Sequence, residues 1–271
     1  SQWVGMGREL LATEPVFRAS IEACGRALAA HVGWDLTTQL CCLPAASQSA
    51  EPLPAEANAS RLSELDVVQP VLWAIEVALA ALWRSWGIEP DAVVGHSMGE
   101  VAAAHVAGAL SLEDAARVIA LRSKLVRERA SGHGGMALVE LSLAQAEQAI
   151  VGREAQLAVA VSNGPRASVL SGEVEALEAV LAQLRERDVF CRRINVDYAS
   201  HSPQMDALRA DLITALEGLQ PQACAVPMLS TVTGEWLREV PVDAQYWARN
   251  LREPVRFADA VRGLALAGHD V

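Results

Sequence analysis

A serine lies at the centre of a glycine-bounded turn, because residues 95–99 read GHSMG. An apolar run at 92–94 comes before the turn, and helix-favouring residues follow it from Glu100. The pattern G-x-S-x-G between a strand and a helix is typical of a nucleophile elbow. Ser97 is therefore a candidate nucleophile, and the alternative is a serine that only caps the helix.

The surroundings of this serine predict how the turn works. We expect Gly95 and Gly99 to avoid side-chain clashes with neighbouring backbone. Free amides and the helix dipole stabilise a developing oxyanion at a helix N-terminus. The backbone N–H of Met98, the residue after the nucleophile, is the expected donor.

A serine hydroxyl is a poor nucleophile until a base takes its proton, and six histidines are available for this role. His201 lies in the segment 197–203, at the junction between two predicted subdomains, where clefts form. His96 is next to Ser97, so its side chain should point away from the hydroxyl. The other four lie near helix ends, in a hinge or on a packed helix: His31, His269, His133 and His105.

A positive charge is also predicted near the serine. Arg122 lies on the helix that follows the elbow helix, and the two helices should form a hairpin that points Arg122 back toward Ser97. A guanidinium there can hold a carboxylate in a bidentate grip. The alternative is a solvated arginine like its neighbours Arg117, Arg127 and Arg129.

The composition of the 271 residues sets the broad class. Hydrophobic residues make up 52% and charged residues 20%, which predicts one large globular domain with or without a smaller insert. The net charge of −11 argues against a broad nucleic-acid-binding surface. The most apolar stretch, at 71–83, is interrupted by Glu76 and is expected to be too short to span a bilayer.

The cysteines point to the compartment. There are five, an odd number, and no C-x-x-C pair occurs. A disulfide framework and a zinc site are therefore not expected, and a reducing cytoplasm fits best. No signal-peptide pattern opens the sequence.

Hydrophobic periodicity predicts the elements that position these residues. The first part should contain helices at 8–11, 15–31, 69–86, 100–110 and 112–130, with a surface loop at 41–60. The last part should contain a helix at 204–219, a strand at 228–231 and a helix at 254–267. Between them, strands at 136–140, 157–162, 167–171 and 190–194 alternate with helices at 143–150 and 173–187.

The order of that middle part is β-α-β-β-α-β, the ferredoxin-like unit. The predicted fold class is therefore α/β. Residues 1–133 and 202–271 form a hydrolase-like large subdomain with a parallel sheet and the nucleophile elbow. Residues 134–201 form the small ferredoxin-like subdomain.

Several segments together resemble the acyltransferase domains of modular type I polyketide synthases, relatives of the malonyl-CoA:acyl carrier protein transacylases. They are GHSMGE at 95–100, the position of Arg122, YASH at 198–201, SQWVGMG at 1–7, QP at 69–70 and YWARNL at 246–251. The resemblance covers nearly the whole chain, and the combination is far more specific than G-x-S-x-G alone.

The resemblance implies a role for each matching residue. Ser97 would form the acyl-enzyme, and His201 would act as base and then as acid for the leaving thiol. Arg122 would pair with the free carboxylate of the extender unit. The main-chain carbonyl of Asn250 would orient the imidazole, in place of the acid of a triad. Other residues would line the substrate site: Gln69, His96, Tyr198 and Ser200.

The resemblance also implies substrates and partners. An acyl-CoA would donate the acyl group to Ser97, and the phosphopantetheine thiol of an acyl carrier protein would accept it in a ping-pong cycle. No bound cofactor and no metal would be needed. An adjacent ketosynthase domain of the same megasynthase would be a further partner, with no nucleic acid or membrane involved.

Two segments suggest methylmalonyl as the extender unit. DVVQ at 66–69 and YASH at 198–201 are similar to methylmalonyl-selecting domains, whereas malonyl selectors usually carry phenylalanine at the position of Ser200. Met98 departs from the glutamine that methylmalonyl enzymes often have. The family pattern also has a strand and a Gly-Gln-Gly segment before Ser1, whose glutamine is the second oxyanion donor, and a strand after Val271; the printed sequence contains neither.

Three other functions stay open at this stage. A malonyl-specific acyltransferase differs only in the acyl pocket. A serine hydrolase would use water as acceptor, but it would normally supply an acid before the histidine and has no use for a carboxylate-binding arginine. An inactive scaffold domain would not need Ser97, His201 and Arg122 together.

Overall fold

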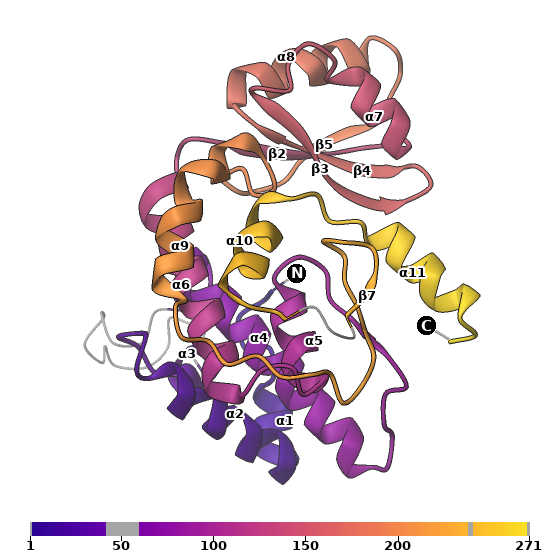
Figure 1. Cartoon of the computed structure of the whole chain (residues 1–271). Helices are drawn as coiled ribbons and strands as arrows, with labels where there is room; N and C mark the ends of the chain where they lie inside the picture. The colour runs from indigo at the N-terminus through magenta and orange to yellow at the C-terminus, as the bar shows by residue number, and fades with distance from the viewer. Residues whose placement is uncertain (1, 42–59, 238–240, 270–271) are drawn as a thin grey trace.

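Two β-sheets organise the computed structural model, which describes residues 2–41, 60–237 and 241–269 (Figure 1). In the larger part, β1 (Val93–Val94) pairs in parallel with β6 (Met228–Leu229), and β6 pairs antiparallel with β7 (Trp236–Leu237). The strand β7 was not predicted from the sequence. The surface loop predicted at 41–60 lies almost entirely outside the described residues.

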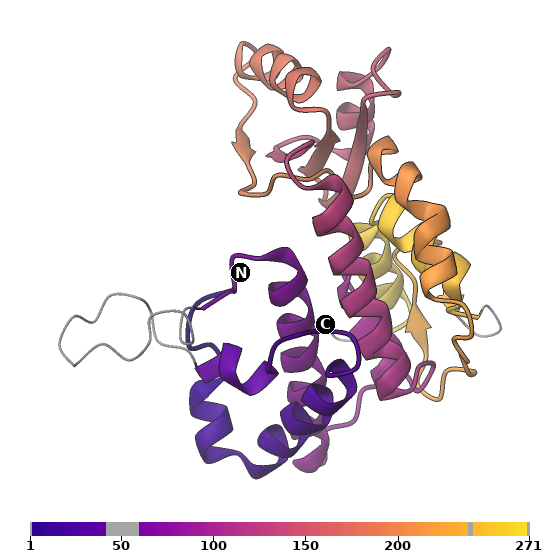
Figure 2. The ribbon, with the colours of Figure 1, turned by 90° about the vertical axis from the view of Figure 1, so that its left-hand side faces the viewer.

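Helices surround this sheet and form most of the core. They are α1 (Arg8–Thr13), α2 (Pro15–Leu28), α3 (Leu36–Cys41), α4 (Leu65–Ser85), α5 (Gly99–Val106), α6 (Leu112–Ala130), the 3-10 helix η1 (Pro203–Leu208), α9 (Arg209–Ala215), α10 (Ala244–Arg252) and α11 (Phe257–Leu266). Figure 2 shows α6 running between the N-terminal helices and the C-terminal segments, up to the small subdomain. Ser111 caps α6, since its hydroxyl accepts from the Asp114 N–H at 3.0 Å.

The helix α4 departs from the prediction. It begins at Leu65, more than one turn before the expected start at Gln69, so Pro70 lies inside it. A proline at this place removes only one intrahelical hydrogen bond, the one to the Asp66 carbonyl. Complete burial of Val67 and Val71 in the core offsets that loss.

The same helix is longer than the apolar stretch read from the sequence. With 21 residues, α4 is long and apolar enough to cross a bilayer by length and composition alone. It packs instead against α2, α5 and α6, with Trp73, Ala74 and Ala78 completely buried. Burial among helices accounts for its apolar character in this structure.

The small subdomain has the predicted ferredoxin-like order. Its strands are β2 (Gly135–Val139), β3 (Leu157–Gly164), β4 (Ala167–Gly172) and β5 (Cys191–Arg193), and its helices are α7 (Leu143–Ala149) and α8 (Val174–Arg185). The sheet order is β3-β4-β2-β5, with all described pairs antiparallel. All of these strands and helices lie within the expected 134–201 segment.

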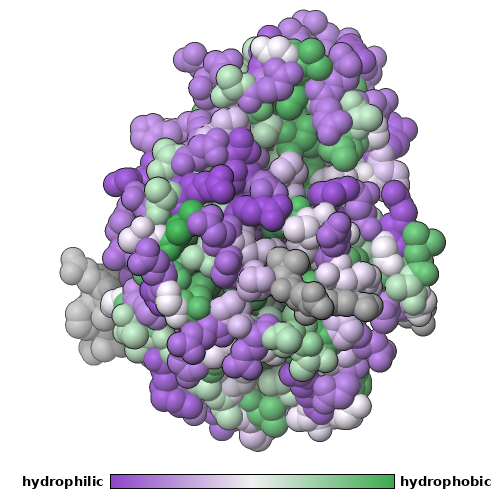
Figure 3. Space-filling view, viewed as in Figure 1, coloured by the Kyte–Doolittle hydropathy of each residue, from purple (hydrophilic) through white to green (hydrophobic). Residues whose placement is uncertain are grey.

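The two parts are joined by main-chain hydrogen bonds as well as by two chain crossings. Val255, just after α10, donates from its N–H to the Ala160 carbonyl at 2.8 Å and accepts from the Ser162 N–H at 3.0 Å. The segment after α10 thereby extends the edge of the small sheet along β3. Figure 3 shows hydrophilic residues gathered over α9 and α10 on this face.

Candidate active site

Ser97 lies in a strained turn between β1 and α5. Its φ is 55°, in the left-handed region that non-glycine residues rarely adopt. The turn is closed by hydrogen bonds from the Gly99 N–H to the His96 carbonyl at 3.0 Å and from the Glu100 N–H to the Ser97 carbonyl at 3.1 Å. Such strain costs on the order of 1–3 kcal/mol and is typical of functional sites.

The two glycines of the turn have different roles. A Cβ at Gly95 would lie 2.2 Å from the backbone nitrogen of Glu100, so only glycine fits there. At Gly99 a Cβ would meet nothing within 4 Å. The expectation that Gly99 also avoids a clash is therefore wrong, because α5 turns its α-carbon toward open space.

We expect these glycines to respond differently to alanine. Gly95→Ala should destabilise the fold by about 1–3 kcal/mol or more, because backbone must move to admit the methyl group. Gly99→Ala should stabilise it by about 0.4–1 kcal/mol, because alanine reduces the entropy of the unfolded chain. Urea unfolding of both variants measures the difference, and equal midpoints would contradict the close approach of backbone to Gly95.

A histidine meets the serine across the fold. The Nε2 atom of His201 lies 2.7 Å from Oγ of Ser97, although the residues are 104 positions apart. The Nδ1 atom lies 2.8 Å from the main-chain carbonyl oxygen of Glu253. Since a carbonyl only accepts, the proton sits on Nδ1, and Nε2 presents its lone pair to the serine hydroxyl.

Burial keeps this histidine neutral. His201 is 2% exposed. Its pKa is lowered to about 3, first by burial and then by the positive charge of Arg122. The ring is therefore unprotonated at Nε2 at neutral pH and can accept the serine proton.

The orientation of the imidazole corrects one expectation. The carbonyl that accepts from His201 belongs to Glu253 and not to Asn250. The reason is that Asn250 lies within α10, whereas Glu253 follows the helix with extended backbone that turns its carbonyl toward the ring. Asn250 contributes its side chain instead, and Nδ2 donates to the Ser97 carbonyl at 3.1 Å.

Arg122 is buried, so the interpretation as a solvated arginine is wrong. Only 1% of the residue is exposed, and Nη1 donates to Oε1 of Gln69 at 2.9 Å. Its Nε is buried without a partner, and no carboxylate of the described residues pairs with the guanidinium. Burial lowers the pKa of Arg122 to about 10, which leaves it charged at neutral pH.

The other predicted site residues fall around this group. Tyr198 is half-buried, and burial raises its pKa while Arg122 and a hydrogen bond with Gln69 oppose the rise. Ser200 is buried, and its carbonyl accepts from the Ser171 hydroxyl at 2.7 Å. The segment before His201 thus lies beside the buried guanidinium.

His96 and Met98 occupy the turn itself. The exposed His96 side chain reaches the small subdomain, where Nε2 lies 2.8 Å from Oδ1 of Asn163. Its ring also contacts Phe257 at the start of α11. Within the described residues, no backbone or side-chain acceptor takes the Met98 N–H. Met98 is the N-cap of α5, and its role as an oxyanion donor stays a prediction.

Comparison with known proteins places the chain in a family. All residues, 1–271, match the acyl transferase domain family. The chain belongs to this family. It is 51% identical over 273 residues to polyketide synthase GfsE of Streptomyces halstedii, and the match covers 100% of the chain and 7% of GfsE. Erythronolide synthase EryA3 of Saccharopolyspora erythraea is 48% identical over 271 residues, covering 100% of the chain and 8% of EryA3.

Solved structures agree with this assignment. The acyltransferase domain from module 8 of the salinomycin polyketide synthase has a TM-score of 0.91 and 46% identity, covering 99% of this chain and 60% of that chain. The malonyl CoA-acyl carrier protein transacylase of Coxiella burnetii has a TM-score of 0.84 and 26% identity. That match covers 99% of this chain and 81% of the transacylase chain. The predicted two-subdomain α/β fold is confirmed. The chain spans less than a tenth of the length of GfsE and of EryA3.

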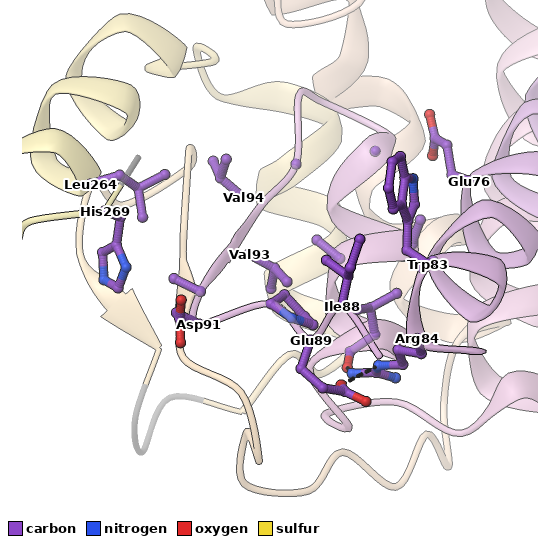
Figure 4. A pocket seen from close by; sticks show the side chains of 18 of the residues that line it. Glu76, Trp83, Arg84, Ile88, Glu89, Asp91, Val93, Val94, Leu264 and His269 are labelled. Atoms are coloured by element: carbon purple, nitrogen blue, oxygen red, sulfur yellow. Dashed lines mark hydrogen bonds and ion pairs between the residues drawn. The ribbon is translucent and has the colours of Figure 1, made fainter. Parts of the chain in front are cut away.

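A separate cavity of about 750 Å³ in this acyl transferase domain lies along β1 (Figure 4). Trp83 of α4 and Leu264 of α11 line it from opposite sides, with Val94 between them. It touches the back of the elbow at Gly95, but the side chains of Ser97, His201 and Arg122 do not line it. His96 and Gly99 of the elbow also line it, but the cavity is distinct from the cluster of Ser97, His201 and Arg122.

Sequence reasoning missed two contributors to the site. Glu253 acts through its main-chain carbonyl, which no side-chain pattern could reveal. Glu100 was given no role of its own, yet it is completely buried and hydrogen-bonded to three residues of the C-terminal part of the domain. An acidic residue followed by an apolar run at 101–104 was the available signal.

Proposed function

We propose that this domain is an acyltransferase that transfers a carboxylated extender unit from CoA to Ser97, and then to an acyl carrier protein in polyketide synthesis. The observation that carries the proposal is a buried arginine without an anionic partner among the described residues, beside a hydrogen-bonded serine and histidine. The matching relatives are polyketide synthases and an erythronolide synthase. A carboxylate on the acyl group supplies the charge that the site lacks.

The arrangement of Ser97 and His201 suits both halves of a ping-pong cycle. Nε2 of His201 takes the hydroxyl proton as Oγ attacks the thioester carbonyl, and the oxyanion accepts from the Met98 N–H. The C–S bond breaks, and the CoA sulfur leaves with the proton from Nε2. The thiol of the carrier protein then gives its proton to Nε2 and attacks the ester, and Ser97 regains its hydrogen.

Arg122 gives the site a reason to prefer carboxylated acyl groups. An unpaired buried charge is costly, and a bidentate carboxylate would satisfy it. The same contact would act on the base, because Arg122 lowers the pKa of His201. A bound substrate carboxylate would offset that positive charge and would raise the pKa of His201, which strengthens the base when the correct substrate is present.

A transfer assay tests the proposal. Incubation with malonyl-CoA should shift the mass of the peptide that contains Ser97, and added phosphopantetheinylated carrier protein should remove the shift and become acylated itself. We expect transfer to exceed release of free acid at saturating carrier protein. Free acid as the main product would favour a hydrolase, and a protein that never acquires the adduct would favour a scaffold.

We propose methylmalonyl as the preferred extender unit. Ser200 is buried directly before His201, and a serine side chain fills less volume there than the phenylalanine that malonyl selectors usually carry. Because one methyl group separates the substrates, discrimination of about 1–3 kcal/mol is the most to expect. The carrier protein and an adjacent ketosynthase domain are the proposed partners. The cycle as written uses groups of this chain, acyl-CoA as donor and the carrier thiol as acceptor.

Ser200→Phe should move the preference toward malonyl-CoA by about 10- to 200-fold, since the ring would fill the space for the methyl group. Competition between the two CoA esters in one tube, read as the ratio of acyl-enzyme masses, measures it. Ser202→Ala is the matched control, because that buried serine bonds to the Ala199 carbonyl instead. An unchanged ratio would mean that the selectivity lies elsewhere.

A further inference from the structure

Glu100 is a buried carboxylate with an unusual set of neighbours. It is completely buried at the start of α5, and no basic side chain of the described residues pairs with it. Oε1 accepts from the N–H of Thr231 at 2.5 Å and from its hydroxyl at 2.9 Å. Oε2 accepts from the Tyr246 hydroxyl at 2.7 Å and from Nδ2 of Asn250 at 2.9 Å. The carboxylate is thus surrounded by donors.

Two of these donors also reach the elbow. The Thr231 hydroxyl lies 3.1 Å from the carbonyl oxygen of Gly95, and Nδ2 of Asn250 also donates to the Ser97 carbonyl at 3.1 Å. Glu100 itself donates its N–H to that same Ser97 carbonyl. The Ser97 carbonyl is therefore tied to the Glu100 carboxylate through Asn250. The Gly95 carbonyl, two residues before the nucleophile, is linked to it through Thr231, whose single hydroxyl hydrogen is shared between the two acceptors.

The other connection leads to the histidine. Tyr246 and Asn250 lie one turn apart on α10, so Glu100 holds this helix at two points. The chain leaves α10 at Glu253, whose carbonyl accepts from Nδ1 of His201. The N–H of His201 also donates to the Leu251 carbonyl of α10 at 3.0 Å. Displacement of α10 would therefore move the base.

We infer that Glu100 is a positioning residue that fixes Ser97 and His201 at the correct positions relative to each other. Through Asn250 and Thr231 it fixes the turn that carries Ser97, and through α10 it fixes the carbonyl and backbone that hold His201. The inference rests on the proposed function, because it assigns a role to Glu100 only if these two side chains react. A role in core stability alone would lower stability without a selective loss of serine reactivity.

The test is the rate at which a fluorophosphonate, which needs only an activated serine, labels Ser97 in the full chain. In Glu100→Gln, an amide N–H₂ replaces one carboxylate oxygen. This donor then faces at least one of the groups that donated to Glu100, and that hydrogen bond is lost. We expect about 10²-fold slower labelling, the cost of a misplacement near 1 Å, with the KM for acyl-CoA changed by less than about twofold. Thermal unfolding confirms that the variants compared are folded.

Two further variants make the outcome clear. Glu76→Gln changes a carboxylate of α4 that lines the cavity along β1, and it should label at the wild-type rate. Tyr246→Phe removes one donor to Glu100 but keeps the ring, and it provides the test if Glu100→Gln does not fold; we expect slower labelling there too. Folded Glu100→Gln or Tyr246→Phe protein that labels at the wild-type rate would overturn the inference. Failure of the wild-type protein to label at Ser97, where Ser97→Ala is the blank, would instead overturn the proposed function.

Discussion

His201→Ala should slow acylation of Ser97 by malonyl-CoA about 10²- to 10⁴-fold, the usual contribution of a general base. The expectation follows from the 2.7 Å contact between Nε2 and Oγ and from the lowered pKa that keeps the ring neutral. Ser97→Ala should give no acyl-enzyme. Rapid-quench mass spectrometry of the acylated peptide measures both rates.

A double variant, Ser97→Ala with His201→Ala, tests whether the two residues act together. Since the two side chains act as one unit, their losses should not add, and the double variant should resemble Ser97→Ala alone. His133→Ala is the matched control, because that exposed histidine lies in the hinge before the small subdomain. Retention of near-wild-type acylation by His201→Ala would remove the proposed base, whatever the distance between the atoms.

Arg122→Ala should reduce acylation by malonyl-CoA about 10²- to 10³-fold while acetyl-CoA, which has no free carboxylate, keeps its rate. Loss of one partner of a buried charge pair costs roughly 2–5 kcal/mol, and this expectation lies within that range. The comparison is the ratio of kcat/KM for the two thioesters. The loss should appear only where the acyl group carries a negative charge.

Arg127 on the same helix gives the control for this experiment. It is partly exposed and pairs with Glu64 and Asp66, so Arg127→Ala should leave the ratio unchanged. Equal losses on both thioesters in Arg122→Ala would show that the arginine supports the fold or the base, and not the substrate carboxylate. The acetyl-CoA arm is needed for this distinction, since the Gln69 contact holds the guanidinium without substrate.

The sequence alone was sufficient for features with local causes. The elbow follows from a short apolar run, a turn with Gly95 and a helix start, all within a few residues. The βαββαβ order follows from the change of hydrophobic period between strands and helices. Element boundaries were less accurate, as at Pro70, because tertiary burial outweighed the local cost of proline within a helix.

The place of His201 at the predicted junction of the subdomains made it the candidate base, and the family resemblance supported its pairing with Ser97, because periodicity and spacing cannot specify a contact across 104 positions. It also suggested a main-chain acceptor for the imidazole but placed it on the wrong residue. A main-chain carbonyl has no residue type to identify it, and only the extended backbone after α10 assigns it to Glu253.

The sequence by itself thus determined the candidate nucleophile, the order of the elements and the candidates for base and carboxylate clamp. Only the tertiary structure decided that Arg122 is buried without an anion among the described residues, that Glu253 orients the ring, and that Glu100 links the turn to α10. The physical reason is that residue type and period set local conformation. Burial and hydrogen-bond partners depend on which distant segments pack together.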